Sequence, residues 1–430
     1  MPSIPVPTAK TVENFTKLEL FAIIQKLQEQ ITQLQAEVAA LRKNSSTSSK
    51  PPSSDIVKPP KPKSSGAGAP GGQKGHPGFF RKLFPAERVD EIKDYRLSEC
   101  PECKIPLGPE HQTEPWIQQT AELPEKLIHR TEHRRFGYRC PQCRRQLYAP
   151  LPTALEQGEL FGPRLQSLVV YMKGALHGSY TSLQEFMGEV FELQVSRSML
   201  CDSVRAVSPS LAPPYKELEK AIADQPRLHI DETGHKDNGR RYWIWAFCTR
   251  LFGFFTVEAS RGSQVLKKVL GETFKGTLIT DFFSAYTKYA NAFQQFCLAH
   301  LVRDIKFLTT LPDTANQQFG IRLLRQFKRL FYFWHLRRTM PQERYCWVIS
   351  VIQRNLRALV SEKQLPRKSQ NIANRLDKHW SSYLRFLLDP SIAPTNNLAE
   401  QTLRTIVIDR KITQGTRSEW GRQWLSLIHI

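Results

Sequence analysis

Hydrophobic residues recur along the chain with more than one period, and each period predicts a different kind of element. Near the N-terminus they follow a heptad, with leucines at one position and β-branched residues at the other: Leu20, Leu27, Leu34 and Leu41, with Ile24, Ile31 and Val38 between them. This pairing is typical of parallel two-stranded coiled coils. Residues 15–43 are therefore predicted to form a coiled coil (leucine zipper) between two copies of the chain, with packing on the same chain as the alternative.

A helical period returns in residues 151–215. Apolar residues three and four apart predict one helix after Gly162-Pro163, a second over 181–191 and a third that Ser196 caps. Two short helices joined by residues 192–195 suit a helix-turn-helix that binds DNA. A plain helical bundle is the alternative.

From residue 227 the pattern changes to short runs of β-branched and aromatic residues. These runs predict three antiparallel strands, a crossover helix and two further strands, over residues 227–231, 241–249, 252–258, 264–269, 277–281 and 295–298. The order is that of a ribonuclease H-like mixed sheet, so the predicted fold class is α/β. This core is expected to span residues 220–430, with a helical insertion over 312–390.

Two earlier segments stand out by composition. Residues 44–82 hold 13 Pro and Gly and eight Ser, with seven Lys or Arg and one Asp, which predicts a flexible basic linker. Residues 83–150 contain two C-x-x-C pairs: Cys100, Cys103, Cys140 and Cys143. Zn²⁺ prefers four thiolates in a tetrahedron, and each pair supplies two from a tight turn. The segment is predicted to be a zinc ribbon with structural Zn²⁺, and a redox pair is the alternative.

The charge of the chain narrows the class of partner. Sixty-one Lys and Arg against 40 Asp and Glu leave a net charge of +21, which favours a polyanion such as nucleic acid. Fourteen of these cations lie between Arg322 and Lys378 with three acids, so the insertion is predicted to contact DNA. No apolar run approaches the ~20 residues of a spanning helix, and the N-terminus lacks a signal-peptide pattern. A cytoplasmic protein without membrane contact is expected.

Two strands of the predicted core end in an acid, at Asp231 and Asp281. Neighbouring strands lie ~4.8 Å apart, and carboxylates at that distance repel each other unless a cation lies between them. Oxygen ligands select Mg²⁺ or Mn²⁺, and a two-metal site needs a further acid from another element. Glu400 is the candidate, because it begins a predicted helix; an ordinary surface pair with Arg404 is the alternative.

The segments that carry these acids resemble the three catalytic blocks of insertion sequence 66-type DDE transposases. They read IDETG around Asp231, LITDFFSAY around Asp281 and TNNLAEQTLR around Glu400. The GGQKGHPG motif, the zipper and the four cysteines also match that family's order, so the resemblance covers roughly residues 15–425. It implies that Asp231, Asp281 and Glu400 bind Mg²⁺ or Mn²⁺ as a triad on the ribonuclease H-like core.

The activity implied by the resemblance is Mg²⁺-dependent cleavage at the ends of a bacterial mobile element, followed by transfer of the freed 3′-OH to target DNA. Cys297-Leu298-Ala299-His300 resembles a C-x2-H element of such enzymes, which places His300 near the active site and on DNA. Arg404, Arg410 and Lys411 follow Glu400 and are predicted to hold phosphates. The implied partners are DNA, a second copy of the chain and accessory proteins of the element, at the nucleoid.

Two departures from the family pattern keep other functions open. Glu192 stands where the helix-turn-helix commonly has Gly, and the chain stops at Ile430 where relatives continue into further helix. One alternative is a non-catalytic dimeric zinc-ribbon protein, a decayed or truncated copy that acts as a repressor. The other is a ribonuclease H-like nuclease or junction resolvase. Strand transfer of a pre-cut end separates a transposase from a nuclease, and metal-dependent cutting separates it from a repressor.

Overall fold

The computed structural model describes residues 16–44, 47, 83–152, 161–289 and 291–427. The chain divides into two compact units, one of residues 1–60 with 157–430 and the other of residues 61–156. The predicted linker lies almost entirely outside the described residues, and so does the GGQKGHPG motif. Of the helices described, none is both long enough and apolar enough to cross a membrane.

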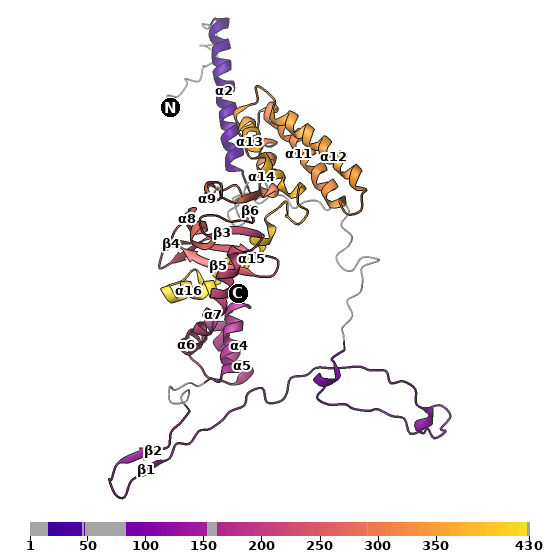
Figure 1. The fold of residues 1–430 in the computed structure, drawn as a ribbon, viewed down its shortest axis with the longest axis vertical. Coiled ribbons are helices and arrows are strands. Elements are labelled where there is room, and N and C mark those ends of the chain that lie inside the picture. The colour runs from indigo at the N-terminus through magenta and orange to yellow at the C-terminus, as the bar shows by residue number, and fades with distance from the viewer. Residues whose placement is uncertain (1–15, 45–46, 48–82, 153–160, 290, 428–430) are drawn as a thin grey trace. The chain divides into compact units, whose positions relative to one another are not determined.

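The leucine heptads lie on a single helix, α2 (Lys17–Leu41), as predicted (Figure 1). A capping box begins it: the Glu19 backbone N–H donates to the Thr16 hydroxyl, and the Thr16 backbone N–H donates to the Glu19 carboxylate. The heptad side chains from Ile24 to Leu41 are exposed on this helix. The helix is thus confirmed, and the pairing of two copies stays a prediction.

The cysteine unit contains only short elements in its described part, residues 83–152. They are the 3₁₀ turns η2 (Ala86–Arg88) and η3 (Pro109–His111) and the antiparallel strands β1 (Gly137–Arg139) and β2 (Gln146–Tyr148). None of the residues described here is buried. Apolar packing therefore does not explain the path of this segment.

The predicted helices of residues 161–207 are present and are followed by two more elements. They are α4 (Pro163–Gly174), α5 (Tyr180–Phe191), α6 (Arg197–Val207), η4 (Ser208–Leu211) and α7 (Ala212–Ala223). Val169, Leu183 and Leu200 are buried where α4, α5 and α6 meet. Glu192 ends α5 in the left-handed conformation, with φ 54°, and the next N–H, of Leu193, donates to the Met187 carbonyl. The backbone thus takes the shape that favours Gly at this position.

A five-stranded mixed sheet forms the centre of the larger unit, in the order β5-β4-β3-β6-β7 (Figure 1). Its strands are β3 (Arg227–Asp237), β4 (Arg240–Cys248), β5 (Gly253–Glu258), β6 (Thr277–Thr280) and β7 (Phe293–Phe296). The first three are antiparallel, and β6 and β7 run parallel to β3. The predicted strands are present in the predicted order, with bounds that shift by one or two residues; the strand predicted over 295–298 lies at 293–296. The largest correction is that β3 continues six residues past Asp231, because that stretch pairs with β4 rather than β6.

Helices cover both faces of the sheet. One face packs α7, α8 (Gln264–Leu270) and α9 (Ser284–Lys288) against buried residues such as Leu228 and Trp245. The other face packs α15 (Asn397–Thr413) and α16 (Glu419–Leu427) against Ile244 and Ala246. Successive residues of a strand point to opposite faces, so Asp231 lies on the α15 side and Glu232 on the α9 side.

The segment between β7 and α15 is helical, and it begins at residue 298, before the insertion predicted over 312–390. It consists of α10 (Leu298–Leu308), α11 (Thr314–Leu336), α12 (Gln342–Val360), α13 (Arg367–Lys378), α14 (Trp380–Leu384) and η5 (Arg385–Leu387), coloured orange in Figure 1. Its core includes Leu323 and Ile352, and this core is continuous with Phe296 of β7. The insertion is thus packed onto the sheet through α10 and β7.

Gly415 fixes the far end of α15 against the far end of β3. Its φ of 114° is one that L side chains rarely adopt, and a Cβ here would lie 2.3 Å from the Lys236 carbonyl oxygen. The next residue, Thr416, donates its N–H to that oxygen and accepts from the Asn238 N–H. Only Gly permits this approach, which ties the C-terminal end of α15 to the far end of β3.

Candidate active site

Asp231 and Asp281 occupy equivalent positions on neighbouring parallel strands. Arg227 of β3 pairs with Thr277 of β6, so residues 231 and 281, each four further along, correspond in register. Asp281 follows the last residue of β6, and its carboxylate accepts the Phe283 N–H at 2.9 Å. The Asp231 carboxylate accepts the Glu232 N–H at 2.9 Å. The register therefore brings the two predicted acids to one edge of the parallel pair.

The charges of these acids act on one another. Burial raises the pKa of Asp231 well above its usual range, and the negative charges of Glu232, Asp281 and Glu400 raise it further. Burial also raises the pKa of Asp281, to which Glu400 again contributes. Glu400 comes from α15, so acids from three elements share one electrostatic environment. Carboxylates held together in this way favour a cation or a proton between them.

Asn396 positions the start of α15 and thereby Glu400. This residue is buried, and its side-chain amide donates to the Ile230 carbonyl at 2.8 Å while its amide oxygen lies 3.1 Å from His229 Nδ1. Its backbone N–H donates to the Cys297 Sγ at 3.1 Å. Asn396 stands at the N-cap of α15, but its side chain makes no cap bond and reaches across to β3. No periodicity distinguishes a cap from such a cross-link, and so the role was missed.

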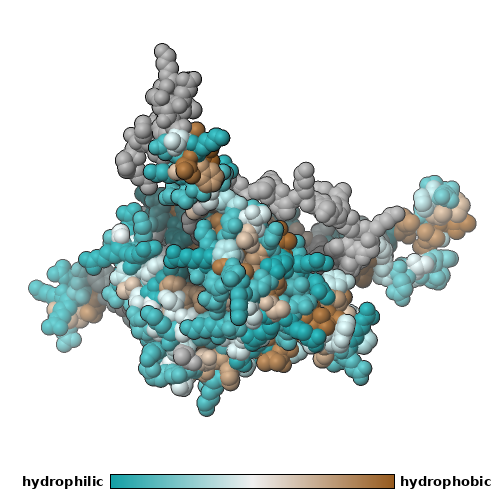
Figure 2. Space-filling model, turned by 90° about the horizontal axis from the view of Figure 1, so that it is seen from above, coloured by the Kyte–Doolittle hydropathy of each residue, from teal (hydrophilic) through white to brown (hydrophobic). Residues whose placement is uncertain are grey.

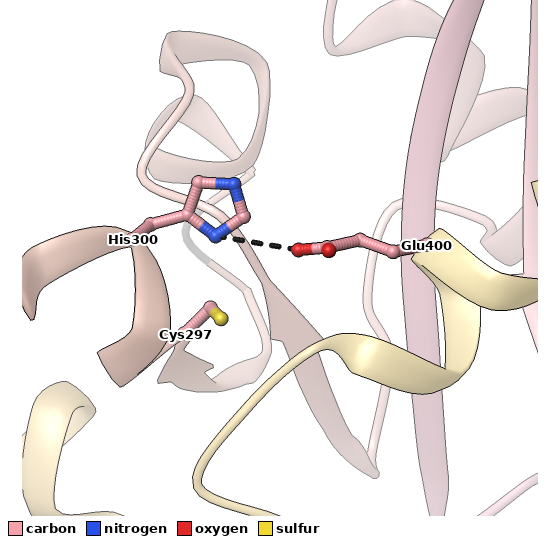
Figure 3. Close-up of side chains that lie close together, drawn as sticks. All are labelled: Cys297, His300 and Glu400. Carbon is pink, nitrogen blue, oxygen red and sulfur yellow. Dashed lines mark ion pairs between the residues drawn. The ribbon is translucent and has the colours of Figure 1, made fainter. Parts of the chain in front are cut away.

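Glu400 faces α10 rather than Arg404. Its Oε1 lies 3.6 Å from His300 Nδ1 (Figure 3). Its Oε2 lies 3.8 Å from the Arg303 guanidinium. Burial lowers the pKa of His300 to about 4, and the charge of Arg303 lowers it further. His300 thus lies beside Glu400, and its place in an active site and its contact with DNA stay predictions.

Two sets of donor atoms thus share Glu400. Among the described residues, Cys297, His300 and Glu400 form a group whose ligand atoms all lie within 4.8 Å of one another. Asp231, Asp281 and Glu400 do not form such a group, although their charges interact. In a two-metal site the acids are spread around ions ~3.5–4 Å apart, so they need not all touch one ion.

A buried network beside Asp231 was not foreseen from the sequence. The Glu232 carboxylate accepts Arg261 Nε at 2.8 Å and Nη2 at 2.7 Å, and it also accepts the Tyr286 hydroxyl. Arg261 lies over the rings of Trp243, at 4.5 Å, and Phe283, at 3.9 Å. Burial and the Asp281 charge raise the pKa of Glu232 to about 7, against the opposing effect of Tyr286 and Arg261. The sequence feature that could have indicated this network is the pair of adjacent acids, Asp231 and Glu232.

The three basic residues after Glu400 differ in their surroundings. Arg404 and Lys411 are exposed on α15. Arg410 is half-buried and donates to the Thr233 hydroxyl at 3.2 Å and to the Gly234 carbonyl, and burial lowers its pKa. Arg410 is therefore committed to β3, which leaves the predicted phosphate contacts to Arg404 and Lys411.

The two cysteine pairs fold in the same local way. The Cys100 N–H donates to the Ile105 carbonyl, and the Lys104 N–H donates to the Cys100 carbonyl. The same two bonds recur at Cys140, with the Arg145 carbonyl and the Arg144 N–H. Lys104 and Arg144 both have positive φ, at 60° and 56°. Backbone N–H groups, those of Cys103 and Cys143 above all, lower the pKa of the Cys100 and Cys140 thiols. The turns suit thiolate ligands, but the described structure does not bring the four sulfurs together.

Exposed cations follow the insertion helices. Figure 2 shows the face seen from above as mainly hydrophilic, with hydrophobic residues in separate patches. Arg325 and Lys328 of α11 and Arg344 of α12 are exposed, and so are the aromatic side chains of Tyr332 and Trp347. Cations interleaved with exposed aromatic rings suit a nucleic-acid surface.

Comparison with known proteins identifies relatives of most of the chain. The family model described as "Transposase IS66 family" matches residues 158–424, and a family of unknown function, DUF6444, matches residues 6–82. Two uncharacterized proteins of Sinorhizobium fredii are similar. Protein y4hP is 22% identical over 312 residues, which are 64% of this chain and 56% of that protein. Protein y4jD is 24% identical over 377 residues, 78% of this chain and 70% of that protein.

Proposed function

Because the chain belongs to the IS66 family of transposases, we propose that it cuts the ends of its mobile element and joins them to target DNA with a DDE triad of Asp231, Asp281 and Glu400. The observation that carries this proposal is the register of β3 with β6, which aligns Asp231 with Asp281, together with Glu400 on α15. The charge of Glu400 raises the pKa of both aspartates, which agrees with this arrangement. The strand order of the mixed sheet supports a ribonuclease H-like core.

The acids fit divalent cations. Asp231 and Asp281 offer oxygen ligands from equivalent positions of β3 and β6, and Glu400 offers a third carboxylate from α15. Mg²⁺ or Mn²⁺ bound there would polarise the scissile phosphodiester and stabilise the charge that develops on its oxygens. The protein's own contribution is to hold the carboxylates at fixed places before DNA arrives, which lowers the cost of reorganisation.

Cationic residues around this edge would orient DNA. Arg404 and Lys411 are exposed on α15, the helix that carries Glu400. The insertion supplies further exposed cations, and each phosphate that a cation neutralises makes binding more sensitive to salt. We propose that α15 holds the cleaved strand and that the insertion holds flanking DNA. The helices α5 and α6 and a zinc ribbon at the two cysteine pairs would add contacts to the element's ends.

The proposal is tested with Asp231→Asn in a Mg²⁺-dependent cleavage assay on the element's terminal sequences, followed by strand transfer of a pre-cut end. The variant should lose cleavage by about 10³-fold or more and keep its DNA affinity. Asp224→Asn, an exposed aspartate at the end of α7, is the matched control. Cleavage by Asp231→Asn at the control's rate would remove Asp231 from the mechanism. Hydrolysis without strand transfer by the wild type would indicate a nuclease, and DNA binding without cutting a repressor.

Two copies of the chain would pair through α2, because two element ends must be joined. The exposed apolar seam of α2 supports parallel pairing. Ile31→Asp places a charge in this seam and should shift the chain from dimer to monomer in sedimentation velocity. Gln30→Asp, one residue outside the seam, should leave the dimer intact. A dimer that survives Ile31→Asp would exclude the seam as the interface.

A further inference from the structure

Cys297, His300 and Glu400 combine the donor types of a zinc site. Cys297 precedes α10 and His300 lies in its first turn, so a spacing of three places both side chains on one side of that helix, facing Glu400 of α15 (Figure 3). The His300 Nδ1 and Glu400 Oε1 atoms are buried, and neither has a hydrogen-bond partner among the described residues. Buried polar atoms in this state require a partner that the protein does not supply.

The separations of the three donors are close to those of a bound ion. Zn²⁺ bonds of ~2.0–2.3 Å to nitrogen, oxygen and sulfur place tetrahedral ligands roughly 3.3–3.6 Å apart. His300 Nδ1 and Glu400 Oε1 are 3.6 Å apart, and all three donors lie within 4.8 Å of one another. Small side-chain rotations would bring the three donor atoms to the separations of a bound Zn²⁺ ion. A sulfur and a nitrogen ligand favour Zn²⁺ over Mg²⁺, which prefers oxygen alone.

Burial raises the pKa of the Cys297 thiol to about 11, and backbone N–H groups oppose this effect. The Asn396 backbone N–H donates to the Cys297 Sγ at 3.1 Å, so the sulfur is held in place at the start of both α10 and α15. Helix N-termini favour negative charge. Arg303 lies 3.8 Å from the other Glu400 oxygen, Oε2, so Oε1 is the oxygen that faces the ion.

From this geometry we infer that Cys297, His300 and Glu400 form a Zn²⁺ site separate from the cysteine pairs, with a fourth position open to water. The inference also has a regulatory consequence, which rests on the proposed function. Glu400 belongs to both ligand sets, and with Zn²⁺ on Oε1 and the Arg303 guanidinium beside Oε2, both of its oxygens are engaged away from the acid triad. Zn²⁺ at this site therefore withdraws Glu400 and inhibits Mg²⁺-dependent cleavage.

The binding test counts zinc on the full-length chain by native mass spectrometry, after brief exposure to a small excess of Zn²⁺ and desalting. Cys297→Ser should carry one Zn²⁺ fewer than the wild type, and its zinc affinity at this site should fall by at least about tenfold. Cys346→Ser, an exposed cysteine on α12, is the matched control and should keep the wild-type count. Equal counts in all three proteins would overturn the inference.

A second variant covers a failure of Cys297→Ser to fold, since that side chain is buried. His300→Gln keeps a polar side chain of similar size, and it should also carry one Zn²⁺ fewer. A full zinc count in a folded His300→Gln protein would equally overturn the site.

The regulatory step is measured separately, as inhibition of Mg²⁺-dependent cleavage by added Zn²⁺. Inhibition should be at least about tenfold weaker in Cys297→Ser than in Cys346→Ser. Identical inhibition of the two variants would overturn the regulatory step. If the wild type binds the additional Zn²⁺ but cuts no DNA, the site stands and the proposed function fails.

Discussion

The sheet and the cysteine unit are organised by different forces. In the sheet, Ile230, Trp245 and Leu278 are fully buried between helices on both faces. In residues 83–152 none of the described residues is buried, and large side chains such as Tyr95 and Trp116 are 90% and 85% exposed. Apolar burial stabilises the first region without help, whereas the second needs another source of free energy. The two cysteine turns share the same hydrogen bonds, and the zinc predicted there would be such a source.

The largest expected effect comes from removing the ligands of the zinc that is predicted in the cysteine unit. Structural Zn²⁺ contributes on the order of 10 kcal/mol to small metal-bound folds, so Cys100→Ser with Cys140→Ser should unfold this unit. Limited proteolysis of the full chain should then cut rapidly within residues 83–152 and leave 161–427 protected. Cys346→Ser is the control for loss of a thiol. Unchanged protection of residues 83–152 in the double variant would mean that metal does not organise them.

The second effect tests the sheet through a backbone contact. Gly415→Ala places a Cβ against the Lys236 carbonyl oxygen at a φ of 114°, and it should destabilise the larger unit by about 3 kcal/mol. Gly239→Ala is the matched control, because its φ is also positive, at 78°, but no atom lies within 4 Å of the added carbon. The control should cost about 1 kcal/mol of strain. Urea unfolding measures both, and equal losses would contradict the contact.

The sheet and the cysteine unit also differ in how much of their structure could be predicted from the sequence. Strand order and helix positions in the core were predictable because alternation and helical periods report local burial, and the register that aligns Asp231 with Asp281 followed from them. The cross-link by Asn396 and the network of Glu232 with Arg261 were not predictable, since both join segments far apart in the chain through polar groups that have no period. In the cysteine unit only the pairs were informative, because the intervening residues have no apolar pattern to fix a fold.

A third effect concerns pH and the far end of β3. His235 is buried, and its Nε2 lies 3.0 Å from the Thr416 hydroxyl. Four charged groups act on its ring: Arg410, Arg422, Asp237 and Asp409. Burial, together with the two arginines, lowers the pKa of His235. In the unfolded chain a histidine has a pKa of ~6.5, whereas His235 has a lower pKa in the folded protein. Below pH ~6.5 the unfolded chain therefore binds a proton that the folded protein does not, and the fold loses stability until the pH has fallen past the folded-state pKa.

The stability of the larger unit should therefore decrease as pH falls below about 6.5. His235→Gln, which cannot take up a proton, should flatten that decrease in urea-unfolding midpoints measured between pH 8 and pH 5. His335→Gln, an exposed histidine on α11, should keep the wild-type slope. An unchanged slope in His235→Gln would show that other groups cause the pH dependence.

The smallest effect lies at the turn after α5. Glu192 adopts φ 54°, which costs a side-chain-bearing residue about 1 kcal/mol relative to Gly, partly offset by the greater freedom of Gly in the unfolded chain. Glu192→Gly should therefore stabilise the α4–α6 helices by about 0.5 kcal/mol. Glu189→Gly, on the exposed side of α5, should instead destabilise them by about 1 kcal/mol, because its φ is helical and Gly is a poor helix former. Opposite signs from the same substitution, three residues apart, would show that backbone shape sets the preference for Gly. Two losses of equal size would mean that contacts of the Glu192 side chain outweigh the strain of its backbone.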